Sequence, residues 1–148
     1  AGSAPFFRAY QTGFERYEPV DAVTVASAIQ IGDPVNYQKA LKVIQETEGV
    51  VCAVSDQEIL STKAIIDRTG IGCEPASAAG LAGIKQLVAA GVIQPGERTL
   101  TYLTGNLMKD ADVIAEYHLG AAPGEYANQP VVIDANLEAL DRVMSRVL

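Results

Sequence analysis

The sequence predicts an α/β fold in which a mostly parallel sheet is flanked by helices. Short apolar runs alternate with amphipathic stretches of helical length, and the clearest apolar run covers residues 50–54. Strands that alternate with helices of roughly 10–15 residues are typical of βαβ units and a parallel sheet. The chain has 148 residues, 49% of them apolar and 20% charged, which is ordinary for one folded domain.

The predicted strands are three apolar runs, residues 50–54, 99–103 and 131–133. The first run has no polar side chain, the pattern of a strand that is covered on both faces. It leads directly into Ser55, and Glu58 completes a capping box, so we predict a helix over residues 57–68. Three strands make a thin sheet for a chain of this length, and we expect neighbouring strands to come from outside it.

Further helices are predicted from Pro5 onward, over residues 23–31, over residues 34–48 and in a short piece after residue 106. A last amphipathic helix is predicted at the carboxyl end, with its core side formed by Leu137, Leu140, Met144 and Val147. Gly32 is expected to end the helix over residues 23–31. Asp33 is a candidate N-cap for the next helix, with Pro34 at its first position.

The most distinctive predicted helix spans residues 74–90. Pro75 stands at the first helical position, where its missing N–H costs no hydrogen bond. Gly80 and Gly83 each cost roughly 1 kcal/mol relative to Ala inside a helix, so they indicate close packing against a neighbour. Glu74 has two interpretations: a carboxylate that caps the helix, or one that faces a ligand.

Charge and composition exclude several classes of function. A net charge of −7 without a basic cluster argues against binding to nucleic acid. The apolar runs fall short of the roughly 20 residues of a membrane helix, so we expect no membrane partner. Cys52 and Cys73 are expected to be free thiols in the cytoplasm. His118 has no Cys or Asp companion, so it is interpreted as a packing or surface residue, and no metal site is expected.

Candidate ligand-binding residues follow from the rule that open α/β sheets bind ligands beyond the carboxyl ends of their strands. That rule selects Ser55 and the turn that begins at Thr104. The Thr104 hydroxyl can donate to a neutral ring nitrogen, or it can cap the next helix. No lysine stands in a setting that lowers its pKa, so none is nominated as a nucleophile: Lys39, Lys42, Lys63, Lys85 and Lys109.

Three segments, Thr24–Pro34, Gly72–Ala79 and Leu103–Asp110, together resemble the threonine synthase family of pyridoxal-phosphate enzymes of fold type II. Their order and spacing agree with the carboxyl-terminal portion of that family's large domain. The resemblance implies that residues 1–148 are such a portion. It also implies an enzyme that uses pyridoxal phosphate to convert O-phosphohomoserine and water to threonine and phosphate.

The resemblance also implies roles for single residues. Thr104 is expected to meet the pyridine nitrogen of the cofactor, and a neutral hydroxyl there implies a largely unprotonated ring nitrogen. Ala28 and Ile29 are expected to form the wall beside the ring, and Glu74 is expected to lie below it. The family's Schiff-base lysine and Gly-rich phosphate loop precede this segment, so this chain alone is expected to be inactive.

Two other interpretations stay open on the sequence. The chain can be part of a related pyridoxal-phosphate dehydratase that acts on threonine or serine. It can also be a non-catalytic α/β module that binds a small molecule or a partner. As a portion of a doubly wound domain, the chain is expected to self-associate or to form a homo-oligomer, because uncovered strand edges and faces promote pairing.

Overall fold

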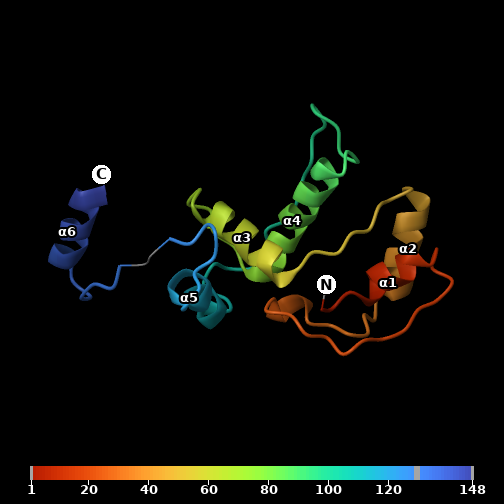
Figure 1. Ribbon diagram of the computed structural model, residues 1–148, viewed down its shortest axis with the longest axis horizontal. Coiled ribbons are helices and arrows are strands. Elements are labelled where there is room, and N and C mark those ends of the chain that lie inside the picture. The colour runs from red at the N-terminus through yellow and green to blue at the C-terminus, as the bar shows by residue number, and fades with distance from the viewer. Residues whose placement is uncertain (1, 129–130, 148) are drawn as a thin grey trace.

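The computed structural model describes residues 2–128 and 131–147. The elements in chain order are α1 (Pro5–Gln11), the 3-10 turn η1 (Ser27–Ile29), α2 (Tyr37–Glu46), α3 (Asp56–Asp67), α4 (Pro75–Ala89), α5 (Ala111–Leu119) and α6 (Leu137–Val147). The molecule is elongated: α3 and α4 lie at its centre, α1 and α2 lie together at one end, and α6 stands apart at the other (Figure 1).

The core lies where α3 and α4 pack against each other, and α4 also packs against η1. Its buried residues are Ala26, Ile59, Ile66, Cys73 and Ala78. Because the α4 side chains here are small, neighbouring segments approach its backbone closely. A Cβ added at Gly80 would collide with the Thr101 hydroxyl, and one at Gly83 would lie 3.2 Å from the Cys52 sulfur. The close packing predicted for the two glycines is confirmed.

The predicted sheet is not confirmed, because no strand forms within residues 2–128 or 131–147. The three apolar runs are extended coil instead. Val50, Leu100 and Val132 have 48%, 79% and 92% of their surface exposed, so these runs lack the covering that a buried parallel strand needs. An extended segment becomes a strand only when a neighbour pairs with its backbone, and sequence alone did not say where that neighbour is.

The helix predicted over residues 23–31 is wrong, since only the η1 turn forms there. Distant parts of the chain bond this backbone instead. The Val23 N–H donates to the Gly2 carbonyl at 3.1 Å, and the Val25 N–H donates to the Asp56 carboxylate at 3.1 Å. The Ser3 hydroxyl lies 3.1 and 2.9 Å from the carbonyl oxygens of Ile29 and Ile31. These long-range bonds replace the local bonds of a helix.

The next helix begins at Tyr37 rather than at Pro34, and Asp33 is not its N-cap. The Asp33 carboxylate accepts a hydrogen bond from the Tyr17 hydroxyl at 2.5 Å, and this bond raises the pKa of Tyr17 to about 12. The rings of Tyr17 and Tyr37 lie 4.0 Å apart, and Phe6 packs edge-on against Tyr37. This aromatic cluster joins α1 to α2.

Both central helices begin as the sequence predicts. Ser55 caps α3 by accepting from the Glu58 N–H at 3.2 Å, and the Glu58 carboxylate accepts from the Ser55 N–H at 2.7 Å, so the capping box is confirmed. Pro75 is the first residue of α4. Glu58 also accepts from the Gln86 side chain at 2.8 Å, which ties α3 to α4.

The final helix is confirmed as α6, but its apolar side does not face a core. Leu137, Leu140 and Met144 are exposed by 77%, 43% and 47%, and the side chain of Val147 lies outside the described ones. In the part of the chain that the structure describes, no helix combines the length and the apolar character needed to cross a membrane.

Candidate functional site

The structure brings together the three segments that carry the family resemblance. The Ser27 hydroxyl, in η1, donates to the Asp110 carboxylate at 3.0 Å. The Glu74 N–H, at the start of α4, donates to the Gly105 carbonyl at 3.1 Å. Ala26 is buried with Cys73 in the core. Residues far apart in the sequence therefore meet around the amino terminus of α4.

Glu74 is the buried acid of this region, with only 4% of its surface exposed. It occupies the N-cap position of α4, but its side chain makes no capping hydrogen bond there. The carboxylate instead accepts from the Thr104 hydroxyl at 3.2 Å and lies 2.8 Å from the Lys109 ammonium. It also covers Gly105, where any Cβ would collide with it.

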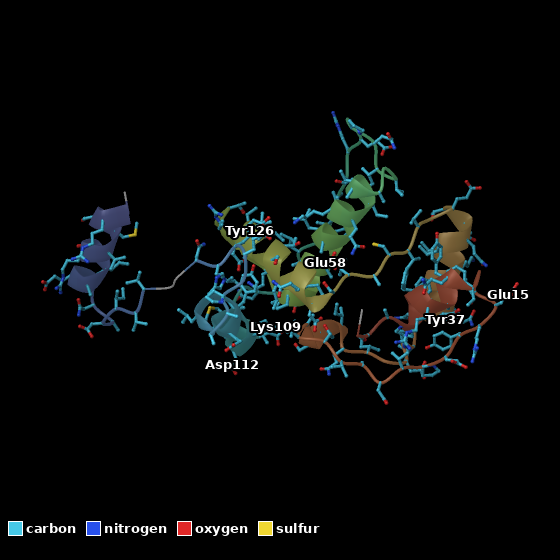
Figure 2. All side chains as sticks on the ribbon, in the orientation of Figure 1. Glu15, Tyr37, Glu58, Lys109, Asp112 and Tyr126 are labelled. Carbon is cyan, nitrogen blue, oxygen red and sulfur yellow. The ribbon has the colours of Figure 1, made fainter. Side chains whose placement is uncertain are left out.

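Lys109 neutralises the Glu74 carboxylate. Its hydrogen bond is the largest cause that holds the pKa of Glu74 below its ordinary value, against the desolvation that raises it. Glu74 in turn raises the pKa of Lys109. Without this ammonium, the Oε2 atom of Glu74 would be buried with no hydrogen-bond partner among the described residues. Lys109 itself is half exposed, and Figure 2 shows it in the middle of the molecule, close to α5.

Ser77 holds the Thr104 turn against the first turn of α4. Its hydroxyl oxygen accepts from the backbone N–H groups of Thr104, at 2.9 Å, and Gly105, at 3.3 Å. It also lies 3.1 Å from the Thr104 hydroxyl oxygen. Neither Ser77 nor Lys109 is among the site residues predicted from the sequence. The sequence does contain a signal for Ser77. It stands three residues after Glu74, and residues spaced i, i+3 on a helix share a face.

Thr104 does not cap the next helix. That helix, α5, begins only at Ala111, after Asp110 in the left-handed conformation with φ 57°. Thr104 is an exposed residue, and its hydroxyl contacts Glu74 and Ser77 at the start of α4. Lys109 already pairs with the Glu74 carboxylate, so the neutral Thr104 hydroxyl is a group that can hydrogen-bond a polar atom of a ring. These residues therefore fit the pyridine end of pyridoxal phosphate.

Ala28 and Ile29 are both exposed in η1. Ile29 lines an open hollow of about 260 Å³ together with Phe6, Phe7 and residues 51–54. Neither Ala28 nor Thr104 lines it. Two of the predicted site residues, Glu74 and Thr104, are thus in contact. The η1 turn that carries Ala28 and Ile29 packs against α4, and the Ser27–Asp110 hydrogen bond also joins it to the segment after Thr104.

The lysine and histidine side chains considered as candidates in the sequence make structural contacts. Lys63 is buried, and its ammonium pairs with the Asp67 carboxylate at 2.5 Å. His118 accepts from the Asn128 N–H at 3.0 Å and packs edge-on against Tyr117, which agrees with its interpretation as a packing residue. Within the described ranges both cysteines are free thiols, and no group of His, Cys, Asp and Glu could hold a metal ion.

Comparisons with known proteins show the family to which the chain belongs. Residues 1–105 match the family described as pyridoxal-phosphate dependent enzyme. The chain is 40% identical to threonine synthase of Methanosarcina acetivorans over 94% of its own length and 33% of that protein's. It is 33% identical to threonine synthase of Methanocaldococcus jannaschii over 99% of the chain and 34% of that protein.

A plant relative and a solved structure extend the same likeness. The chain is 30% identical to chloroplastic threonine synthase 2 of Arabidopsis thaliana, over its whole length and 30% of that protein. The crystal structure of Escherichia coli threonine synthase superposes with a TM-score of 0.59 at 20% identity, over 99% of this chain and 36% of that one, which shows the fold. The chain thus spans about a third of the length of these relatives. The resemblance to threonine synthases is confirmed, and the chain belongs to the family of pyridoxal-phosphate dependent enzymes.

Proposed function

We propose that residues 1–148 form the carboxyl-terminal portion of the large domain of a threonine synthase. The proposed reaction converts O-phosphohomoserine and water to threonine and phosphate. The observation that carries the proposal is the contact among Thr104, Glu74 and Lys109, which joins two of the resembling segments at one buried carboxylate. Three threonine synthases among the relatives match nearly the whole chain.

In this proposal the chain supplies the ring-nitrogen side of the cofactor site. Pyridoxal phosphate, when bound, provides the electron sink for chemistry at the carbons of an amino acid. Thr104 would hold the pyridine end of the ring through its hydroxyl. Glu74 and Ser77 orient that hydroxyl, and Ala28 and Ile29 would border the ring.

The lysine that binds the cofactor covalently would come from another part of the protein. Lys63 is buried in its pair with Asp67, and Lys109 is held by Glu74. The extended runs 50–54 and 99–103 would become strands when further strands of a parallel sheet pair with them. Such pairing would cover the apolar side chains that this chain exposes. The two free cysteines favour a reducing compartment such as the cytoplasm.

The test is an assay of the complete protein with two substrates. Release of phosphate from O-phosphohomoserine, with formation of threonine, is expected. Formation of a 2-oxo acid from threonine without phosphate release would instead identify a dehydratase and overturn the proposal. Thr104→Val is expected to weaken binding of pyridoxal phosphate, measured by its absorbance, whereas Thr104→Ser should retain most of it because the hydroxyl remains.

A second experiment asks whether this chain carries the covalent lysine. The 148-residue chain is mixed with pyridoxal phosphate, reduced with borohydride and examined by mass spectrometry. No stable adduct at a specific lysine is expected. A single modified lysine at stoichiometric yield would show that the chain holds its own nucleophile, and the proposed division of the site would be wrong.

A further inference from the structure

The η1 segment, residues 24–31, has little secondary structure of its own, since only the turn Ser27–Ile29 forms within it. Side chains of distant residues hold its backbone and its middle. The Ile31 N–H donates to the Ser3 hydroxyl oxygen at 3.1 Å, and the Ser27 hydroxyl donates to the Asp110 carboxylate at 3.0 Å. The beginning of the segment is held by a third residue, Asp56 of α3.

Asp56 binds the beginning of the η1 segment with both of its carboxylate oxygens. Oδ1 accepts from the Thr24 hydroxyl at 2.6 Å, and Oδ2 accepts from the Val25 N–H at 3.1 Å. The Thr24 hydroxyl oxygen accepts in turn from the N–H of Ala26, a fully buried core residue, at 3.3 Å. Buried N–H groups need a hydrogen-bond partner. One carboxylate therefore provides for the donors of three consecutive residues, directly or through Thr24.

Asp56 is free to make these bonds because its neighbours cap the helix. It is the first residue of α3, directly after the N-cap Ser55. The rule on strand ends selected Ser55 as a ligand-binding candidate, but the N–H and the hydroxyl of Ser55 both bond Glu58. The residue at this end of the apolar run 50–54 that reaches another segment is thus Asp56.

The backbone of the η1 segment is held while two of its side chains stay open. Ala28 and Ile29 are both exposed. Thr24 and Ile29 line the same open hollow of about 260 Å³, so the residue that Asp56 holds and a predicted ring-wall residue border one space. A surface that is fixed before its ligand arrives loses less conformational entropy on binding. Such a surface suits a flat, rigid ring.

We propose that Asp56 is a positioning residue of the cofactor site. Through Thr24 and Val25 it fixes the η1 segment before the ligand binds. Ala28 and Ile29 then meet the cofactor ring as a preformed wall, and Asp56 itself need not touch the ring. This inference rests on the proposed function for the identity of the ligand.

The first measurement is amide hydrogen exchange in the complete protein without cofactor. Asp56→Ala should make the amides of the η1 segment exchange about tenfold faster, because bonds to a charged group are lost, while the amides of α4 keep their rates. Thr24→Val leaves α3 and its charge intact and should also speed exchange in this segment. Thr24→Ser retains the hydroxyl and should stay close to wild type. The matched control is Asp112→Ala, at an exposed aspartate in the first turn of α5, which should leave the segment unchanged.

The second measurement adds pyridoxal phosphate to the same variants of the complete protein. An absorbance titration gives its affinity, and circular dichroism at its absorption band reports how firmly the ring is held in one orientation. Asp56→Ala and Thr24→Val should weaken binding several-fold and reduce the dichroism of the bound cofactor. Thr24→Ser and Asp112→Ala should retain the wild-type values of both.

Each outcome has one meaning. Faster exchange that is confined to α3, with the η1 segment unchanged in Asp56→Ala and Thr24→Val, overturns the inference and leaves Asp56 with a role in its own helix. Faster exchange in the η1 segment with unchanged affinity and dichroism shows that the segment is not the ring wall, which overturns the inference while the function stands. Failure of the wild-type protein to bind pyridoxal phosphate overturns the proposed function, and exchange alone then decides whether Asp56 fixes the segment.

Discussion

At the scale of single residues, the contact between Glu74 and Lys109 decides the chemistry of the site. A buried carboxylate without a partner costs several kcal/mol and takes up a proton instead of remaining charged. Here a half-exposed lysine lies 2.8 Å away and makes the charged form the stable one. The charge of Glu74 is therefore available to orient a neutral hydroxyl, while the ion pair as a whole presents no net charge to a ligand.

The ion pair predicts how stability depends on pH. The pKa of Glu74 is lowered from 4.5, so its contribution is present above that value and is lost as pH falls through the lowered pKa. The pKa of Lys109 is raised from 10.5, so its contribution is present below that value and is lost as pH rises through the raised pKa. The difference in unfolding temperature between wild type and Lys109→Met should be greatest between these two pH values.

Thermal unfolding of the complete protein across pH measures this difference, with Lys39→Met as the matched control. The difference should shrink in acid and in strong alkali, where one partner loses its charge. A difference that stays constant from acid to alkaline pH would show that Lys109 acts through packing of its alkyl stem rather than through its charge.

Gly105 gives a second prediction at this scale. A Cβ at this position would collide with the Glu74 carboxylate, so Gly105→Ala should displace that carboxylate and lower the unfolding temperature. In the Glu74→Ala background the collision is gone, and the same substitution should cost much less. Equal losses in both backgrounds would place the strain in the backbone of the turn instead.

At the scale of elements, local capping chemistry positions the two central helices. The capping box at Ser55 and Glu58 sets the start of α3 directly after an apolar run. Glu58 reaches further and accepts from Gln86 of α4 at 2.8 Å, and these bonds hold its pKa below the ordinary value. Pro75 sets the start of α4, so Glu74 and Ser77 arrive at the same end of the same helix.

Removal of the α3 cap has a definite cost. Ser55→Ala should lower the free energy of unfolding by about 1 kcal/mol, because the Glu58 N–H loses its acceptor and the Glu58 carboxylate loses its hydrogen bond from the Ser55 hydroxyl. Ser55→Thr keeps the hydroxyl and should lose only a fraction of that amount. Denaturant titration measures both changes, and a neutral Ser55→Ala would show that water replaces the cap without loss.

At the scale of the whole molecule, the apolar extended runs stand out because little covers them. Leu100 and Tyr102 are each 79% exposed, and Val132 is 92% exposed. Chains that bury such runs between other strands gain about 25 cal/mol for each Å² of apolar surface removed from water. The exposed runs therefore mark where further parts of a larger domain are proposed to pack.

The same surface predicts that the 148-residue chain by itself self-associates. Light scattering coupled to size exclusion should show a mass that rises with concentration. Replacing Leu100 and Tyr102 with Lys should reduce this association, because charges on an edge oppose pairing. An unchanging monomer mass over a wide range of concentration would contradict the prediction.

The sequence by itself determined the starts of α3 and α4, because capping boxes and an initial proline act within one turn of helix. It also determined the family, through three short segments whose order and spacing are distinctive. It did not determine the sheet or the segment over residues 23–31, because backbone partners of those residues lie far away along the chain or outside it.

Only the tertiary structure decided what Glu74 does. From the sequence its carboxylate was equally a helix cap or a ligand-facing group, since both need an acid at the same position. The turn from Thr104 to Asp110 brings Lys109 onto it, and a charged partner within 3 Å outweighs the weak attraction of a helix end. This contact joins residues that are distant in sequence, so no local sequence pattern predicts it.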